Sequence, residues 1–171
     1  CPMEQEVRLV YYDPELGGEA WLFQGIDQGF PEHFHTYYVI GTMDRGSRKV
    51  TIAGETFRLA PGELVFFQPG EPHACRPVGE ERLDWRGLHV PQEVMERAAE
   101  AVTGRPFAPH FTPSVLPGSE LTSLFREVGE PVAGGKGALR REEAFPLLVG
   151  RLTERWRGCP RPAAEARAEG R

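Results

Sequence analysis

The sequence predicts a mainly β domain, either a sandwich or a barrel, followed by two or three α-helices. The first ninety residues contain short apolar-rich segments at spacings near ten residues, and glycine and proline interrupt them. The segments after residue 90 instead place apolar residues at helical spacing. A chain of 171 residues is long enough for one domain with a real hydrophobic core.

The predicted strands are rich in β-branched and aromatic residues, and turn signals bound several of them. The segment 48–60 contains two alternating runs on either side of Ala53-Gly54, which predicts a hairpin. The predicted strand segments are 6–12, 20–26, 37–43, 48–60, 63–68 and 82–90.

Three helices are predicted after the strands, over residues 91–102, 119–128 and 138–157. The first has Pro91 at its start and Gly104 just beyond its end, as expected from helix capping. The last contains Pro146, so it either begins near that residue or is kinked there. The proline-rich residues 104–118 are expected to form an ordered loop.

Charge and composition exclude several classes of function for this stretch. Residues 1–137 carry a net charge of −8 and residues 138–171 a net charge of +3, which together give the −5 of the chain. An acidic body is a poor match for a phosphate backbone, so this chain is not expected to grip DNA itself. No apolar run is long enough to span a bilayer, and no signal peptide is visible, so a cytoplasmic protein is expected.

The stretch "PEHFHTYYVIG", residues 31–41, places His33 and His35 two residues apart. On a strand such residues share one face, so both imidazoles would project into one space. His73 follows the turn Pro69-Gly70 and would return to the same interior. Three histidines suit a divalent metal such as Zn, Fe, Mn or Ni. They could equally line a pocket and form hydrogen bonds to a small ligand.

Further candidates for ligand contact follow from strand parity and residue type. Tyr37 continues the parity of His33 and His35, and its hydroxyl needs a partner when buried. Trp85 lies on a predicted strand and is a candidate for a pocket wall. The predicted ligand-binding residues are therefore His33, His35, Tyr37, His73 and Trp85, with the three histidines also the candidate metal ligands. No catalytic residue and no further cofactor are indicated.

Both histidine segments resemble the two motifs of the cupins, which are small jelly-roll β-barrels. Residues 29–46 are similar to the first motif, G(X)5HXH(X)3,4E(X)6G, but Val39 and Ile40 stand where its glutamate would lie. Residues 62–73 are similar to the second motif, G(X)5PXG(X)2H(X)3N, and Pro77 replaces its asparagine. Three neutral imidazoles without the carboxylate would leave more of a metal ion's charge uncompensated.

The order HxHxxYVIG, then PGELVFFQPGEPH, then helices, is similar to the sensing domain of AraC-type transcription regulators. The resemblance implies an arm and first strand over residues 1–19, a cupin barrel over 20–90, a helical dimerisation segment over 91–157 and a linker over 158–171. It also implies a small-molecule effector in the barrel and a homodimer through helices near 138–157. DNA would be bound only by a separate domain absent from this chain. The alternative is a metal-dependent cupin enzyme, a dioxygenase or isomerase, using the three histidines.

Overall fold

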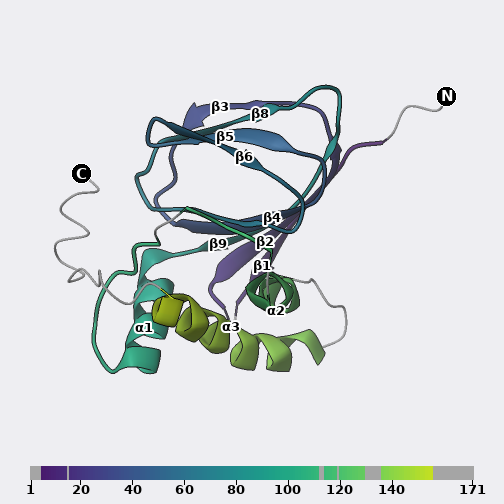
Figure 1. Cartoon of the computed structure of the whole chain (residues 1–171). Helices are drawn as coiled ribbons and strands as arrows, with labels where there is room; N and C mark the ends of the chain where they lie inside the picture. Colours follow the sequence, from purple (N-terminus) through teal and green to yellow (C-terminus); the bar gives the residue numbers. More distant parts are fainter. Residues whose placement is uncertain (1–4, 15, 112–113, 119, 130–135, 156–171) are drawn as a thin grey trace.

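The computed structural model describes residues 5–14, 16–111, 114–118, 120–129 and 136–155, which form ten strands and three helices (Figure 1). The strands are β1 (Val7–Asp13), β2 (Gly18–Ile26), β3 (Phe30–His33), β4 (Tyr38–Arg45), β5 (Arg48–Ile52), β6 (Glu55–Leu59), β7 (Leu64–Phe67), β8 (His73–Pro77), β9 (Leu83–Val90) and β10 (Val115–Leu116). The helices are α1 (Gln92–Thr103), α2 (Glu120–Gly129) and α3 (Lys136–Arg155). The mainly β cupin-type jelly roll followed by helices is confirmed.

Two antiparallel sheets face each other, and the helices cover one of them from outside (Figure 1). The larger sheet has the order β1-β2-β9-β4-β7-β10, and the smaller has the order β3-β8-β5-β6. The helices lie against the outer face of the larger sheet, so this sheet is covered on both faces. The space between the two sheets is consequently the place where an internal cavity can form.

Strand β4 shows how one segment serves two cores. Val39 and Met43 pack between the sheets, whereas Tyr38 and Ile40 belong to the cluster that includes the helices. Side chains alternate between the faces of a strand, so a strand covered on both sides must be apolar at nearly every position. This requirement explains the run "YYVIGTM". The Tyr38 hydroxyl donates a hydrogen bond to the carbonyl of Pro109 at 2.5 Å, which fastens the loop after α1 to the sheet.

The proline-rich segment after α1 packs against the core and contains a short strand. Phe111 is buried in the core under the helices, and Phe107 packs against the same cluster. The prediction of a loop throughout 104–118 was wrong at Val115–Leu116, which form β10 at the edge of the larger sheet, antiparallel to β7. Two residues of edge pairing have too short a pattern to be recognised in a sequence.

Helix α3 runs from Lys136 to Arg155 with Pro146 inside it and exposed to solvent. Its apolar stripe is buried in the chain's own core, with Phe145 and Leu148 against the other helices and the sheet. Leu147, which points the other way, is 50% exposed. A homodimer through residues 138–157 stays a prediction, and it would have to use a face other than this stripe. Residues 158–171, the expected linker, lie outside the described residues.

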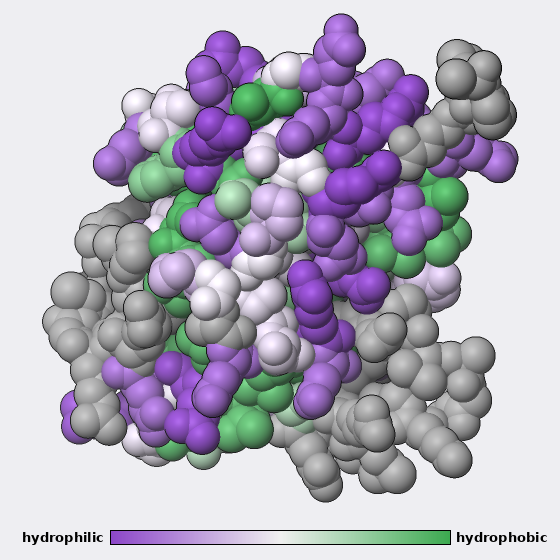
Figure 2. Space-filling view, turned by 45° about the vertical axis from the view of Figure 1, so that its right-hand side comes forward, coloured by the Kyte–Doolittle hydropathy of each residue, from purple (hydrophilic) through white to green (hydrophobic). Residues whose placement is uncertain are grey.

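The surface of the described residues is mainly hydrophilic over the strands, and its hydrophobic areas are small and separate on the side seen in Figure 2. Large exposed apolar side chains include Val10 and Tyr12 of the edge strand β1. No helix in the described part of the chain is long and apolar enough to cross a membrane.

The β5–β6 hairpin confirms the predicted turn at Ala53-Gly54, and both residues have positive φ, +50° and +83°. This is the backbone of a type I′ turn, which favours asparagine followed by glycine. Alanine is strained in that conformation, whereas asparagine tolerates it. Ala53→Asn is therefore expected to raise the free energy of unfolding by about 0.5–1 kcal/mol, measured by urea denaturation. Ala53→Val should lower it, and an equal effect of both variants would contradict this explanation.

Candidate ligand-binding cavity

A cavity of about 190 Å³ lies between the two sheets and is lined by side chains from both. Aromatic and aliphatic groups form most of its wall, among them Trp21, Phe23, Phe67 and Trp85. Such a lining is typical of sites that bind small organic molecules. The predicted ligand-binding residues His33, His35, Tyr37, His73 and Trp85 all line this one cavity.

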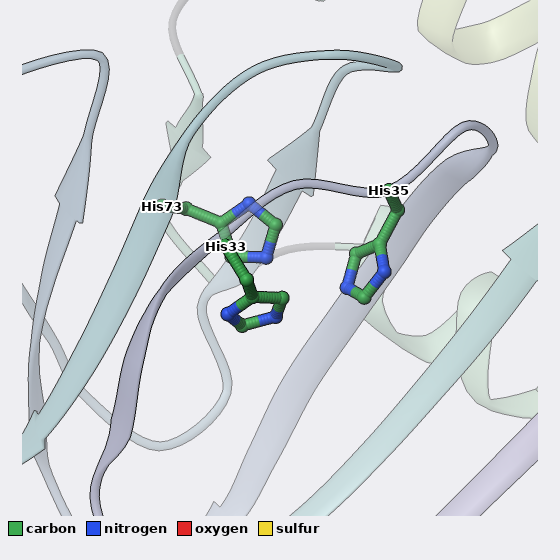
Figure 3. Close-up of side chains that lie close together, drawn as sticks. All are labelled: His33, His35 and His73. Atoms are coloured by element: carbon green, nitrogen blue, oxygen red, sulfur yellow. The ribbon is translucent and has the colours of Figure 1, made fainter.

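The three histidines converge at one end of the cavity (Figure 3). The ring centroids of His33 and His73 lie 4.4 Å apart, those of His33 and His35 4.8 Å, and those of His35 and His73 5.0 Å. His33 is exposed, His35 is partly buried and His73 is buried. The cluster thus lies where the cavity opens to solvent.

The route by which the chain brings His33 and His35 together differs from the prediction. They do not share a strand, since β3 ends at His33 and residues 34–37 cross from the smaller sheet to the larger one. The alternation nevertheless continues through the crossing, because Phe34 is 63% exposed while His35 and Tyr37 face the cavity. The pairing of β3 with β8 shifts register between Phe30 and His33, and such an irregularity re-aims side chains so that both line the cavity.

Backbone carbonyls orient two of the rings. The Nδ1 atom of His33 lies 2.7 Å from the carbonyl oxygen of Pro31, and that of His73 lies 3.0 Å from the carbonyl oxygen of Glu71. Because a carbonyl only accepts, Nδ1 carries the proton in each ring and Nε2 keeps a lone pair. His73 is also stacked on Phe67, with centroids 3.9 Å apart. Each ring is therefore held in one orientation with an acceptor nitrogen available.

Burial favours the neutral form of three histidines of the cavity, His35, His73 and His89. Desolvation first, and then the neighbouring imidazoles, lower the pKa of His73 to about 4 and that of His89 to about 3. The pKa of His35 is lowered for the same reasons, desolvation first and then His33. At neutral pH these rings act as uncharged hydrogen-bonding groups, and their lone pairs are free to bind a ligand or a metal.

A stack of four rings forms one wall of the opening. His35 is stacked on Tyr37, Tyr37 on His89 and His89 on Trp21, with centroid distances of 4.8, 4.8 and 4.6 Å. The sequence analysis did not assign His89 to the site. The signal was present, because His89 has the parity of Trp85 in the β9 segment "LDWRGLHV" and both line the cavity. His89 was not assigned to the site because it lies near the end of the predicted strand.

Trp85 owes its position to glycine. Its indole lies against the backbone of Gly41 on the neighbouring strand, and a Cβ built at Gly41 would come within 2.1 Å of the ring. At Gly87 the corresponding distance to the indole nitrogen is 2.7 Å. The glycine in "YYVIG" therefore makes room for the ring in the cavity wall.

The three imidazoles form a candidate donor set for a metal ion. The three histidine ligand atoms lie within 4.8 Å of one another, whereas ligands of tetrahedral zinc, at about 2.1 Å from the ion, are about 3.4 Å apart. Small ring rotations would close this difference, and the Nδ1 contacts already favour ligation through Nε2 in two of them. The three residues are able to hold a metal ion, although no carboxylate joins them in this cluster.

A second, larger and more open depression of about 730 Å³ borders the cavity at its open end. Its lining includes Glu19 at the start of β2, Gln92 and Glu93 at the start of α1, and also Tyr37 and His89. We call this depression the outer groove. Because Tyr37 and His89 line both spaces, a ligand that displaces these rings would alter the groove between barrel and helix.

Comparison with known proteins places this geometry in a family. The profile of the "AraC-like ligand binding domain" family matches residues 16–149. The chain belongs to the AraC-like ligand-binding domain family. An HTH-type transcriptional regulator of Bacillus subtilis (strain 168), YbfI, described as uncharacterized, is 38% identical over 150 residues, which is 88% of this chain. The chain spans 54% of that regulator's length.

Two of the solved structures that are similar to this AraC-like domain share less than a fifth of its residues. The cupin domain of Cnp3 from Schizosaccharomyces pombe is 14% identical with a TM-score of 0.47, covering 55% of this chain and 70% of that one. KdgF from Halomonas sp. is 18% identical with a TM-score of 0.43, covering 54% of this chain and 91% of that one.

Proposed function

We propose that this AraC-like domain senses a small molecule bound in the cavity and forms part of a transcription regulator. The observation that carries the proposal is the aromatic cavity between the two sheets, with histidines at its opening, in a member of a ligand-binding family. Aromatic walls supply most of the binding free energy, and the imidazole nitrogens supply direction. The small volume favours a compact effector. DNA would be contacted by another domain of the full-length regulator, which would act in the cytoplasm.

The signal would leave the cavity through the rings that it shares with the outer groove. An effector in contact with Tyr37 or His89 changes the wall of the groove, which α1 also lines. Gln92 at the start of α1 donates a hydrogen bond to the carbonyl of Thr36 at 2.7 Å, so the crossing segment and the helix are directly linked. Effector binding would then shift the population between two arrangements of barrel and helices. The arm within residues 1–19 is proposed to take part, since Tyr12 and Glu19 line the groove.

The test is a thermal-denaturation screen of a library of small metabolites against the purified domain. An effector that binds only the folded state raises the melting temperature in proportion to its excess over Kd. His35→Ala, at a partly exposed position of the cavity, is expected to reduce the shift caused by a hit. His110→Ala, at an exposed position that does not line the cavity, is the matched control. Hits that are insensitive to His35→Ala, or no hit at all, would count against sensing in this cavity.

Dimerisation through the segment 138–157 belongs to the same proposal. Because the apolar stripe of α3 is buried within the chain, the pairing surface would include outward residues such as Leu147. Sedimentation equilibrium of the wild-type domain and of Leu147→Glu tests this. A monomer at every concentration, or a dimer that the variant does not weaken, would exclude this surface.

The alternative function, a metal-dependent cupin enzyme, rests on the three converging histidines alone. A divalent ion there, Zn, Fe, Mn or Ni, would act as a Lewis acid with an open coordination position. Elemental analysis of protein purified without chelator tests metal binding. A metal content below about a tenth of an ion per chain, unchanged in His35→Ala, would remove the alternative, because three well-placed ligands retain metal during purification.

A further inference from the structure

Arg48 is a buried arginine in the wall of the cavity, and the sequence analysis assigned it no role. Its side chain is only 1% exposed. One terminal nitrogen donates to the carbonyl of Gln28 at 2.7 Å, and the other donates to the carbonyl of Ile26 at 2.9 Å. The Nε–H group has no hydrogen-bond partner among the residues that the structure describes. A charged group that is desolvated and only partly hydrogen-bonded is costly for the fold, so its presence requires an explanation.

No negative charge offsets this guanidinium. Within the described part of the chain, Arg48 forms no ion pair with a carboxylate, and no aspartate or glutamate lines the cavity. The four histidines of the lining do not supply one, since imidazole is neutral or positive. Burial raises the pKa of the Cys75 thiol, against the opposing charge of Arg48 and a side-chain hydrogen bond with it, so that group is also protonated and contributes no negative charge. The cavity therefore has one uncompensated positive charge at neutral pH.

The wall of the cavity also has more unpaired hydrogen-bond donors than unpaired acceptors. Two buried donors of the lining lack an acceptor, the Nε–H of Arg48 and the indole N–H of Trp21. The two buried oxygen atoms without a partner among the described residues belong to Thr42 and Gln68, and neither residue lines the cavity. A ligand that complements this wall must supply acceptors.

The charge lies at the end of the cavity opposite the histidine cluster. On β5, Ile52 is paired with His73, whereas Arg48 is paired with Pro77. Four residues of strand separate the two levels by about 13 Å along β5. Between them lies an apolar level that includes Val50 and Cys75. The cavity is thus open and imidazole-lined at one end, apolar in the middle and cationic at its floor.

We propose that the effector of this domain is a compact, flat monocarboxylate whose carboxylate pairs with Arg48 and whose apolar body lies between the aromatic walls. The inference rests on the proposed sensing function and names its ligand class. A single planar guanidinium matches the charge and shape of one carboxylate. A phosphate dianion would need more hydrogen-bond donors to offset the free-energy cost of removing it from water. The described wall offers no second cation near Arg48.

A purely structural role would give Arg48 a different signature. In that role the side chain only fastens the carbonyls of Ile26 and Gln28 at the end of β2. Its replacement would then lower stability without changing which ligands the cavity prefers. Charge preference measured on the ligand side distinguishes the two roles and does not require any variant to fold.

The experiment compares benzoate with benzamide, which has nearly the same shape and no charge, by titration calorimetry and by quenching of tryptophan fluorescence at pH 7.5. Trp21 and Trp85 line the cavity and report on its occupation. Benzoate is expected to bind at least about tenfold more tightly than benzamide, the effect of one charge-assisted pair in a desolvated site. Phenylacetate and phenylacetamide repeat the comparison with a longer body.

Variants then assign the preference to Arg48. Arg48→Gln should abolish the preference for the acid, whereas Arg48→Lys should keep part of it. Arg58→Gln removes an exposed arginine of the neighbouring strand β6 and should leave the preference unchanged. Equal binding of acids and amides by the wild-type domain, or no binding of either, overturns the inference. In both cases a neutral hit from the metabolite screen that is sensitive to His35→Ala would leave the proposed sensing function intact.

Discussion

Acidification of the metal-free domain from pH 7 to pH 5 is expected to lower its free energy of unfolding by about 3 kcal/mol, through the two most strongly desolvated histidines. In the folded state the pKa of His73 is about 4 and that of His89 about 3, both below the ordinary value of 6.5. As the pH falls through 6.5, His73 and His89 bind protons in the unfolded chain but remain neutral in the folded chain. Stability is therefore fully present above that pH and is lost progressively toward pH 4.

Urea denaturation at a series of pH values, with a chelator present, measures this dependence. His89→Gln should flatten the curve by about half, because it removes one of the two groups. Arg58→Gln, which changes an exposed arginine of β6 that does not line the cavity, should leave the curve unchanged. A stability that is constant between pH 7 and pH 5 would mean that the cavity admits protons and water freely, which contradicts an enclosed binding site.

Local sequence rules predicted the barrel well, because its strands are separated by turns with strong conformational requirements. The pair Ala53-Gly54 is an example, since Gly54 favours the positive φ of a tight turn and alternating runs flank the pair, although the residue type of Ala53 does not indicate its own positive φ. The convergence of His33, His35 and His73 was also correctly predicted, although the first two are on different structural segments. Alternate side chains continue to face the cavity where residues 34–37 cross between the sheets. The prediction that the histidines converge was therefore right, although the assumption of one continuous strand was wrong.

The parts that were missed depend on contacts distant in sequence. Arg48 shares the parity of Val50 and Ile52, but an arginine at the end of a strand ordinarily lies in solvent. The carbonyls of Ile26 and Gln28, twenty or more residues away along the chain, accept hydrogen bonds from the guanidinium and make its burial tolerable. The apolar stripe of α3 presents the same difficulty, because its periodicity shows that it needs a partner without showing that the partner is the chain's own sheet.

Gly41→Ala is expected to abolish effector binding while costing only about 1–2 kcal/mol of stability. The added Cβ would lie 2.1 Å from the Trp85 ring, so the ring must move. The two nearest atoms are at the far end of the Trp85 side chain, and the adjacent space is the cavity, so the indole can swing inward. The new Cβ would also lie 3.0 Å from the backbone oxygen of Arg86, so this part of β9 must shift by a few tenths of an ångström. The ring would then occupy the volume that the effector needs.

A second substitution, at Trp85, distinguishes an indole that blocks the cavity from a general disruption of the sheet. In Gly41→Ala with Trp85→Leu the colliding ring is gone, so binding should return in part, although the single Trp85→Leu change loses an aromatic wall. A double-mutant cycle on Kd should therefore show strong positive coupling between the two positions. Additive losses would instead indicate that Gly41→Ala disrupts the sheet rather than the cavity. Damage to the sheet would persist when the Trp85 ring is removed, whereas a collision with that ring would disappear. The cycle therefore decides whether the glycine of "YYVIG" keeps the binding site open.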